Sequence, residues 1–154
     1  MFSQTVAALN CQAKGGVFIL KIFDTFTDIM AKLIFMMTCL YTTVKITKPE
    51  DSRICNSEKY LICIDFKGAS TQFLDYLYDM VDSWDKNPGY YPILPLKPST
   101  PFVHSLKQFN NKYVMIQIEK INSALEFVKG ADNFDKQLYT NAYINRGSTQ
   151  FIYV

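Results

Sequence analysis

The sequence predicts an α/β fold, in which a small sheet packs against helices. An apolar, β-branched run at residues 17–23 precedes a stretch with helical periodicity at residues 26–40. Two further strand-like runs follow at residues 42–47 and 59–66. The order strand, helix, strand is typical of a right-handed crossover, and the short third connection indicates that the last two strands are antiparallel.

The chain's length and composition are those of a globular protein. Its 154 residues suit one domain or one and a half, and 49% of them are hydrophobic. Sixteen basic and fourteen acidic residues give a net charge of +2. That balance is too small to predict a nucleic-acid partner, so such a prediction needs a local feature.

The first two elements are a helix and a buried strand. Val6, Leu9 and Ala13 recur at helical spacing before Lys14 and a glycine pair, which predicts a helix ending near residue 13. The run at 17–23 is almost continuously apolar, which predicts a strand buried on both faces, as in a parallel sheet.

The helix expected at residues 26–40 has one apolar face. Thr25 with Asp28 three residues later resembles a capping box, and Asp24 is the alternative cap. The spacing predicts core packing for the apolar positions. These positions are Phe26, Ile29, Met30, Leu33, Ile34, Met37 and Leu40.

The second half of the chain is expected to be mainly helical. Helices are predicted at about 73–84 and 114–129, separated by a proline-rich loop at 87–101, and the apolar end at 151–154 follows a polar, tyrosine-rich segment. Trp84, Tyr90 and Tyr91 have side chains that can stack on a base, but packing is the commoner role of such aromatic residues.

Several classes of protein are disfavoured. The four cysteines, at 11, 39, 55 and 63, form no CxxC pair and His104 is the only histidine, which argues against a zinc site or a thiol enzyme and indicates a reducing compartment. Residues 1–14 lack a signal sequence, and the apolar stretch 31–44 is shorter than the ~20 residues of a membrane span. We therefore expect a soluble, intracellular protein with no membrane partner.

Lys21 is the most informative residue, because a charge inside an apolar strand is costly to bury unless it is paired or functional. It lies toward the carboxyl end of its strand, the end at which open α/β sheets bind ligands. If the third strand runs antiparallel beside it, Glu58 meets Lys21 at the same edge. A buried ion pair, or a lysine whose head reaches solvent at the strand end, is the structural alternative.

The loop before the third strand supplies polar groups at the same edge. They suit phosphates and ribose hydroxyls, although a solvated loop is the ordinary interpretation of such residues. The candidate RNA-binding residues are Lys48, Ser52, Arg53, Asn56 and Ser57.

Two motifs resemble a known family. GGVFILKIFDTFT at 15–27 and KITKPEDSRICNSEKYLIC at 45–63 are similar to the C-terminal half of the FtsJ-like (RrmJ-type) RNA ribose 2′-O-methyltransferases. The nearest likeness is to the mRNA cap-1 enzymes of eukaryotes and large DNA viruses. The likeness covers about residues 4–68 and continues more weakly through 75–77 and 111–127.

The resemblance implies a chemistry. Members of the family use a Lys-Asp-Lys-Glu tetrad to transfer a methyl group from S-adenosylmethionine to a ribose 2′-hydroxyl, without a metal. Lys21 corresponds to the second lysine and Glu58 to the glutamate. Lys21 would orient the hydroxyl and favour its deprotonation, Glu58 would hold the lysine, and Asn56 with Ser57 would approach the nucleotide of a capped RNA.

The resemblance also implies what this sequence lacks. The family's first lysine, glycine-rich cofactor loop and aspartate precede the region that matches, so most of the cofactor site is expected outside this chain. We expect residues 1–68 to be the C-terminal half of a Rossmann-like methyltransferase sheet, and 69–154 a helical extension.

Further expectations follow from the resemblance and from that incompleteness. The chain would be a fragment, one piece of a split gene or a degenerate copy. It would need a partner that supplies the N-terminal half, or would self-associate through an open sheet edge. It would lie in the nucleus or cytoplasm, or in a viral factory if it is viral. The alternative function is that of a non-catalytic RNA-binding or scaffolding remnant of such an enzyme.

Overall fold

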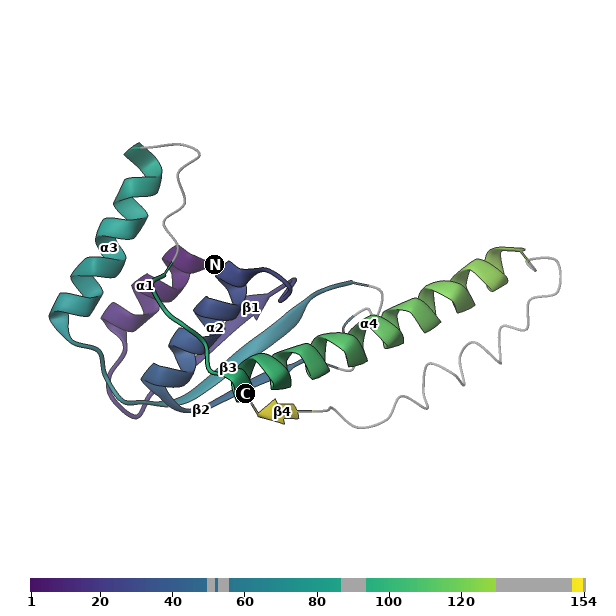
Figure 1. The fold of residues 1–154 in the computed structure, drawn as a ribbon, viewed down its shortest axis with the longest axis horizontal. Helices are drawn as coiled ribbons and strands as arrows, with labels where there is room; N and C mark the ends of the chain where they lie inside the picture. Colours follow the sequence, from purple (N-terminus) through teal and green to yellow (C-terminus); the bar gives the residue numbers. More distant parts are fainter. Residues whose placement is uncertain (50–51, 53–55, 87–93, 130–150, 154) are drawn as a thin grey trace.

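A computed structural model describes residues 1–49, 52, 56–86, 94–129 and 151–153. Helices and strands alternate at first and helices dominate later (Figure 1). In chain order the elements are α1 (Phe2–Cys11), β1 (Val17–Ile22), α2 (Asp28–Leu40), β2 (Tyr41–Thr47), β3 (Lys59–Phe66), α3 (Thr71–Lys86), α4 (Thr100–Lys129) and β4 (Phe151–Tyr153).

The four strands form one sheet in the order β1-β3-β2-β4, and every neighbouring pair is antiparallel. Strand β3 is central to the part of the sheet made by β1, β2 and β3, and the predicted antiparallel pairing of the second and third strands is confirmed. Because β1 and β2 both run antiparallel to β3, they run in the same direction, with β3 inserted between them.

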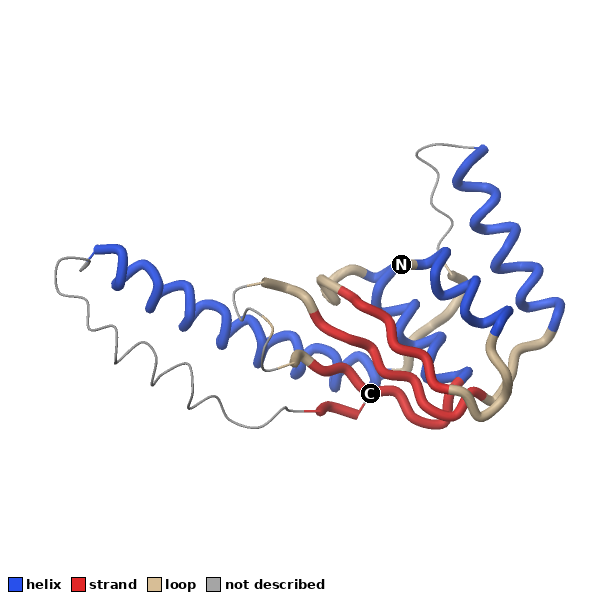
Figure 2. Tube along the Cα trace, turned by 180° about the vertical axis from the view of Figure 1, so that it is seen from behind, coloured by secondary structure: helices blue, strands red, loops and turns tan. Residues whose placement is uncertain are grey.

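One face of the sheet is covered by helices and the other is open. On the covered face Leu20, Ile22 and Leu61 are at most 4% exposed, and α1 and α2 lie behind the strands when the sheet is viewed from its other side (Figure 2). On the open face Val17 and Ile19 are 58% and 60% exposed. The prediction that the first strand is buried on both faces is therefore wrong, because the described helices pack on one side only.

Helix α2 starts two residues later than its apolar pattern suggested. Thr27 is its cap, since the Thr27 side chain accepts a hydrogen bond from the Met30 backbone N–H at 3.3 Å. Neither predicted cap is used, and Thr25 is instead 1% exposed. The predicted core face is buried from Met30 to Met37 and partly buried at Leu40, whereas Phe26 and Ile29, before and in the first turn, are 59% and 49% exposed.

The helices of the second half pack on the same core as the sheet. Helix α3 was predicted at about 73–84 and spans Thr71–Lys86. It brings the Trp84 ring against the Phe2 ring of α1, with ring centroids 4.8 Å apart, which agrees with the packing interpretation of Trp84. Tyr90 and Tyr91 lie outside the described residues. Leu77, Phe102 and Phe109 belong to the same buried cluster as the sheet residues. The domain boundary predicted between residues 68 and 69 stays a prediction.

Helix α4 has 30 residues and is nearly twice as long as the predicted helix at 114–129, because it begins at Thr100. Pro101, predicted to end the preceding loop, lies in the first turn of α4. A proline in the first turn of a helix loses no hydrogen bond, because that N–H has no partner within the helix. The outer half of α4 extends beyond the sheet (Figure 1), and none of the described helices is both long and apolar enough to cross a membrane.

Strand β4 was not predicted. Phe151, Ile152 and Tyr153 pair with Thr47, Ile46 and Lys45 of β2. An apolar run of that length gives too short a pattern to distinguish a strand from a disordered end.

The central strand should dominate stability. Leu61 is 0% exposed on β3, so Leu61→Ala should lower the free energy of unfolding by about 2–5 kcal/mol, through lost burial and the cavity that remains. The matched control is Ile19→Ala, at a site 60% exposed on the neighbouring strand, for which we expect a change of about 0.5 kcal/mol. Urea denaturation followed by far-UV circular dichroism measures both, and equal losses would contradict the assignment of the two faces.

Candidate active site

Lys21 and Glu58 form an ion pair at one end of the sheet. The register of β1 and β3 places Lys21 opposite Tyr60, so that Glu58, just before β3, is next to the end of β1. The Lys21 Nζ lies 3.1 Å from the Glu58 Oε2, and the two side chains are 49% and 21% exposed. The predicted convergence of the two residues is confirmed, although Lys21 projects from the open face and is not buried.

Glu58 is fixed by a second contact. The Tyr60 hydroxyl donates a hydrogen bond to the Glu58 Oε1 at 2.6 Å. This hydrogen bond, together with the Lys21 ammonium and the charge of Lys48, lowers the pKa of the Glu58 carboxyl below its ordinary value. The same hydrogen bond raises the pKa of Tyr60. Glu58 is therefore an anion at neutral pH, with one oxygen toward Lys21 and the other toward Tyr60.

Lys48 organises the loop that precedes Glu58. Its Nζ donates to the Ser52 Oγ at 3.2 Å, to the carbonyl and side-chain oxygens of Asn56 at 2.8 and 2.7 Å, and to the Glu58 carbonyl at 2.9 Å. These contacts occupy the Lys48 ammonium within the loop. The RNA contact predicted for Lys48 stays a prediction, and the geometry gives this lysine a structural role as well.

The other predicted RNA-binding residues lie around the same loop. Ser52, Asn56 and Ser57 are partly exposed, and Arg53 lies outside the described residues. The Asn56 Oδ1 also accepts the Glu58 backbone N–H at 3.3 Å. The structure thus brings Asn56 and Ser57 directly beside Glu58.

Lys59 is a buried lysine beside the candidate site that the sequence did not lead us to predict. It is 3% exposed, and its Nζ donates to the Ser57 carbonyl at 3.0 Å and contacts the Phe23 carbonyl at 3.5 Å, which joins the start of β3 to the end of β1. Burial lowers its pKa, an effect that the charge of Asp24 opposes. The alternation along β3 was the available signal, because it places Lys59 on the same face as buried Leu61.

Side chains of helix α4 contact the residues at this edge of the sheet, and we call this set of contacts the brace. The Asn110 amide donates to the Thr25 carbonyl at 3.1 Å, and the Thr25 hydroxyl donates to the Asn110 side-chain oxygen. One helical turn further along, the Tyr113 ring lies 5.9 Å from the Lys59 ammonium. The Gln117 amide then donates to the Asn56 carbonyl at 3.0 Å. Sequence reasoning missed this brace because it started the helix at residue 114.

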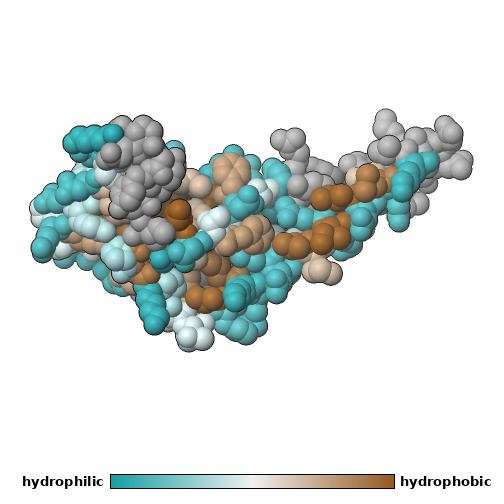
Figure 3. Space-filling view, turned by 45° about the horizontal axis from the view of Figure 1, so that its top comes forward, coloured by the Kyte–Doolittle hydropathy of each residue, from teal (hydrophilic) through white to brown (hydrophobic). Residues whose placement is uncertain are grey.

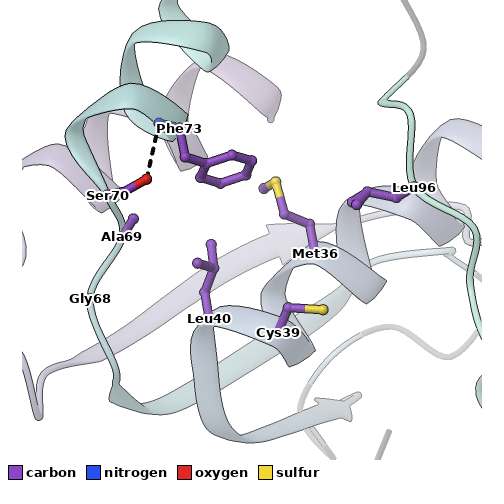
Figure 4. A pocket seen from close by; sticks show the side chains of 8 residues that line it. All are labelled: Met36, Cys39, Leu40, Gly68, Ala69, Ser70, Phe73 and Leu96. Carbon is purple, nitrogen blue, oxygen red and sulfur yellow. Dashed lines mark hydrogen bonds between the residues drawn. The ribbon is translucent and has the colours of Figure 1, made fainter.

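A separate cavity of about 320 Å³ lies elsewhere in the fold. Its walls come from the end of α2, the start of α3 with the residues before it, and Leu96 (Figure 4). Because β3 starts beside Lys21 and ends just before Gly68, the cavity is at the opposite end of the sheet. Its lining is Met36, Cys39, Leu40, Gly68, Ala69, Ser70, Phe73 and Leu96. The Ser70 hydroxyl accepts the Phe73 N–H at 3.3 Å, and the lining offers no charged group for a cationic or anionic ligand.

Comparison with known proteins connects this geometry to a family. Residues 1–66 match the family described as FtsJ-like methyltransferase. The chain is 36% identical over 115 residues to "Cap-specific mRNA (nucleoside-2'-O-)-methyltransferase 1" of Trypanosoma cruzi, an alignment that covers 72% of this chain and 32% of the relative. Proteins of the same name match at 40% over 84 residues in Leishmania braziliensis (52% and 21% covered) and at 27% over 136 residues in Homo sapiens (84% and 16% covered).

The alignments of 115 and 136 residues are longer than the 66-residue family match, so the similarity continues into the helical part. The chain spans about a third or less of the length of these relatives. A relationship to viral enzymes stays a prediction. Residues 1–66 are thus similar to the FtsJ-like methyltransferase family, and the chain is homologous to cap-specific mRNA (nucleoside-2'-O-)-methyltransferases 1.

Proposed function

We propose that this chain contributes the RNA-side part of an mRNA cap 2′-O-methyltransferase site, with Lys21 and Glu58 as its catalytic residues. The observation that carries the proposal is the 3.1 Å ion pair between them, which lies in the FtsJ-like region and on the open face of the sheet. A ribose bound on that face can reach the Lys21 ammonium without any rearrangement of the strands.

The chemistry of the pair suits a hydroxyl nucleophile. A ribose 2′-hydroxyl that accepts a hydrogen bond from the Lys21 ammonium becomes more acidic, because the positive charge stabilises the alkoxide that forms as the proton leaves. Glu58 keeps Lys21 in place, and Tyr60 keeps the Glu58 carboxylate oriented. Asn56 and Ser57 adjoin Glu58, and we propose that they contact the same nucleotide.

S-adenosylmethionine would supply the methyl group, as the family implies. The cavity of about 320 Å³ does not fit this role, because it is apolar and lies at the far end of the sheet from Lys21. We therefore assign no residue of this chain to the cofactor, and we propose that residues outside the chain hold it, without a metal ion.

The open side of β1 is the place where such residues would join. Among the described residues β1 pairs only with β3, and its Val17 and Ile19 side chains are exposed on the face that carries Lys21. A further strand and apolar cover at this position would bury both residues and satisfy the free backbone groups of the strand edge. A second polypeptide or a further part of a longer protein would supply them.

The catalytic role of Lys21 is tested by methyl transfer to capped RNA, with the chain assayed together with the region that completes its domain. Lys21→Met keeps most of the side-chain volume but removes the charge, so transfer should fall by about 100-fold or more. Binding of the same RNA, measured by fluorescence anisotropy, should change much less. Labelled methyl on the 2′-oxygen is the readout.

Lys45→Met is the matched control, since Lys45 lies on the same face of the sheet but two strands away. It should retain transfer. Retention of transfer by Lys21→Met would overturn the role of Lys21. If the parent chain and both variants, each with the completing region, bind the RNA but transfer no methyl group, the non-catalytic RNA-binding function is favoured.

The state of Glu58 can be tested in this chain without any assay of activity. Its carboxyl should titrate below the ordinary glutamate pKa of about 4.3. Lys21→Met should shift that pKa upward, because the cation that favours the charged form is gone. Because the folded-state pKa is lowered, the Glu58 anion stabilises the fold fully at a pH above the ordinary glutamate pKa. This stabilisation is lost as the pH falls through the lowered pKa. Carboxyl-detected NMR titration measures it, and an identical Glu58 pKa in both proteins would show that the pair does not form in solution.

A further inference from the structure

We propose that the outer half of α4 is a dimerisation surface, to which a second copy of this chain binds through its own α4 in antiparallel orientation. The surface is a row of apolar side chains that we call the outer stripe, formed by Val114, Ile118, Ile121 and Leu125. Ile118, Ile121 and Leu125 are 47%, 46% and 52% exposed, and Met115 beside them is 66% exposed. Figure 3 shows hydrophobic side chains along this projecting half of the helix.

The outer stripe is distinct from the face of α4 that packs on the rest of the protein. The packed face contains Phe102, Leu106 and Phe109, which are at most 7% exposed, and partly buried Tyr113. Each residue turns an α-helix by about 100°. Val114 comes one residue after Tyr113, and Ile118 comes one residue after Gln117, which binds the Asn56 carbonyl. The outer stripe therefore points about 100° away from the packed face.

The spacing of the outer stripe is that of a helix pairing with a helix. Its residues follow one another at intervals of four, three and four, the alternation of a heptad seam. Packing on the rest of the protein is made by Phe102, Leu106 and Phe109, so it does not account for the outer stripe. A row of four with this spacing on a projecting helix is more than scattered exposed residues, and it suits a partner that is itself helical.

The charges favour a second copy as that partner. The residues that border the seam are uncharged: Met115, Gln117, Asn122 and Ala124. Between residues 112 and 126 the helix carries two lysines and two glutamates, so two copies meet without net repulsion. A strongly charged partner would find no complementary charge along this border.

The position of the stripe on the helix selects the antiparallel orientation. The first half of α4 is packed against the sheet and its helices, whereas the outer half extends beyond them (Figure 1). Parallel pairing would bring two sheet-bearing bodies to the same end of the helix pair. Antiparallel pairing around a two-fold axis near Ile121 places them at opposite ends, and each copy then presents the same surface to the other.

The seam is short, so the dimer should be reversible. A standard interface buries roughly 800 Å² per partner, more than one helix face of this length offers. Sedimentation equilibrium between about 5 and about 200 µM should therefore show a monomer at low concentration and a dimer at high concentration.

Ile121→Glu tests the surface, because it places two like charges at the centre of the seam and should weaken association by about 10-fold or more. Ile121 is already half exposed, so the variant should fold and unfold like the parent in far-UV circular dichroism. The matched control is Ser123→Glu, which adds the same charge at an exposed position about 200° around the helix from Ile121, and should dimerise normally.

Cross-linking of mixed light and isotopically heavy copies with an amine-reactive reagent tests the orientation. An antiparallel pair should give Lys112–Lys129 links between copies, whereas Lys129–Lys129 links would indicate a parallel pair and overturn the orientation. A parent protein that is monomeric throughout, as it would be if another part of the chain covered the stripe, would overturn the proposal. So would a dimer that survives Ile121→Glu but is broken by Ile19→Glu, since it would use the open face of β1 instead.

Discussion

The antiparallel register between β1 and β3 is the constraint on which the candidate site depends. It sets Lys21 opposite Tyr60 and Ile22 opposite Lys59, so that alternate residues of both strands project to the open face together. A shift by one residue would turn Lys21 toward the helices and separate it from Glu58. The buried partners Leu20 and Leu61 on the covered face oppose such a shift, because it would expose them.

Three lysines at this edge have three different environments, and together they hold Glu58. Lys21 pairs with the Glu58 carboxylate on the open face. Lys48 binds the Glu58 carbonyl and the oxygens of the preceding loop. Lys59 lies beneath, on the covered face, and binds the Ser57 carbonyl. The backbone on both sides of Glu58 is thus fixed by cations, while its carboxylate contacts Lys21 and Tyr60.

The sequence allowed the sheet's first elements and the Lys21–Glu58 pair to be predicted, because strand periodicity and a short connection between strands are local signals. The cost of burying a charge, however, concerns Lys59 and not Lys21, because Lys21 is exposed and Lys59 is the lysine buried among the described residues. A lysine at the start of a strand resembles a polar boundary residue, and its burial depends on Phe23 and Tyr113, which are distant in the sequence. The brace from α4 was unpredictable for the same reason, since Thr25 and Asn110 are 85 residues apart.

The dependence on α4 changes how the FtsJ-like region of this chain should be understood. The family match ends at residue 66, but Phe102, Leu106 and Phe109 belong to the same buried cluster as Leu20 and Leu61. A segment ending at residue 66 would expose the apolar surface that these residues cover and would remove Tyr113 from above the Lys59 ammonium. It would also release the Asn56 carbonyl from Gln117. In this protein the helical part is therefore a structural component of the candidate site, and the geometry around Glu58 is a property of the whole core.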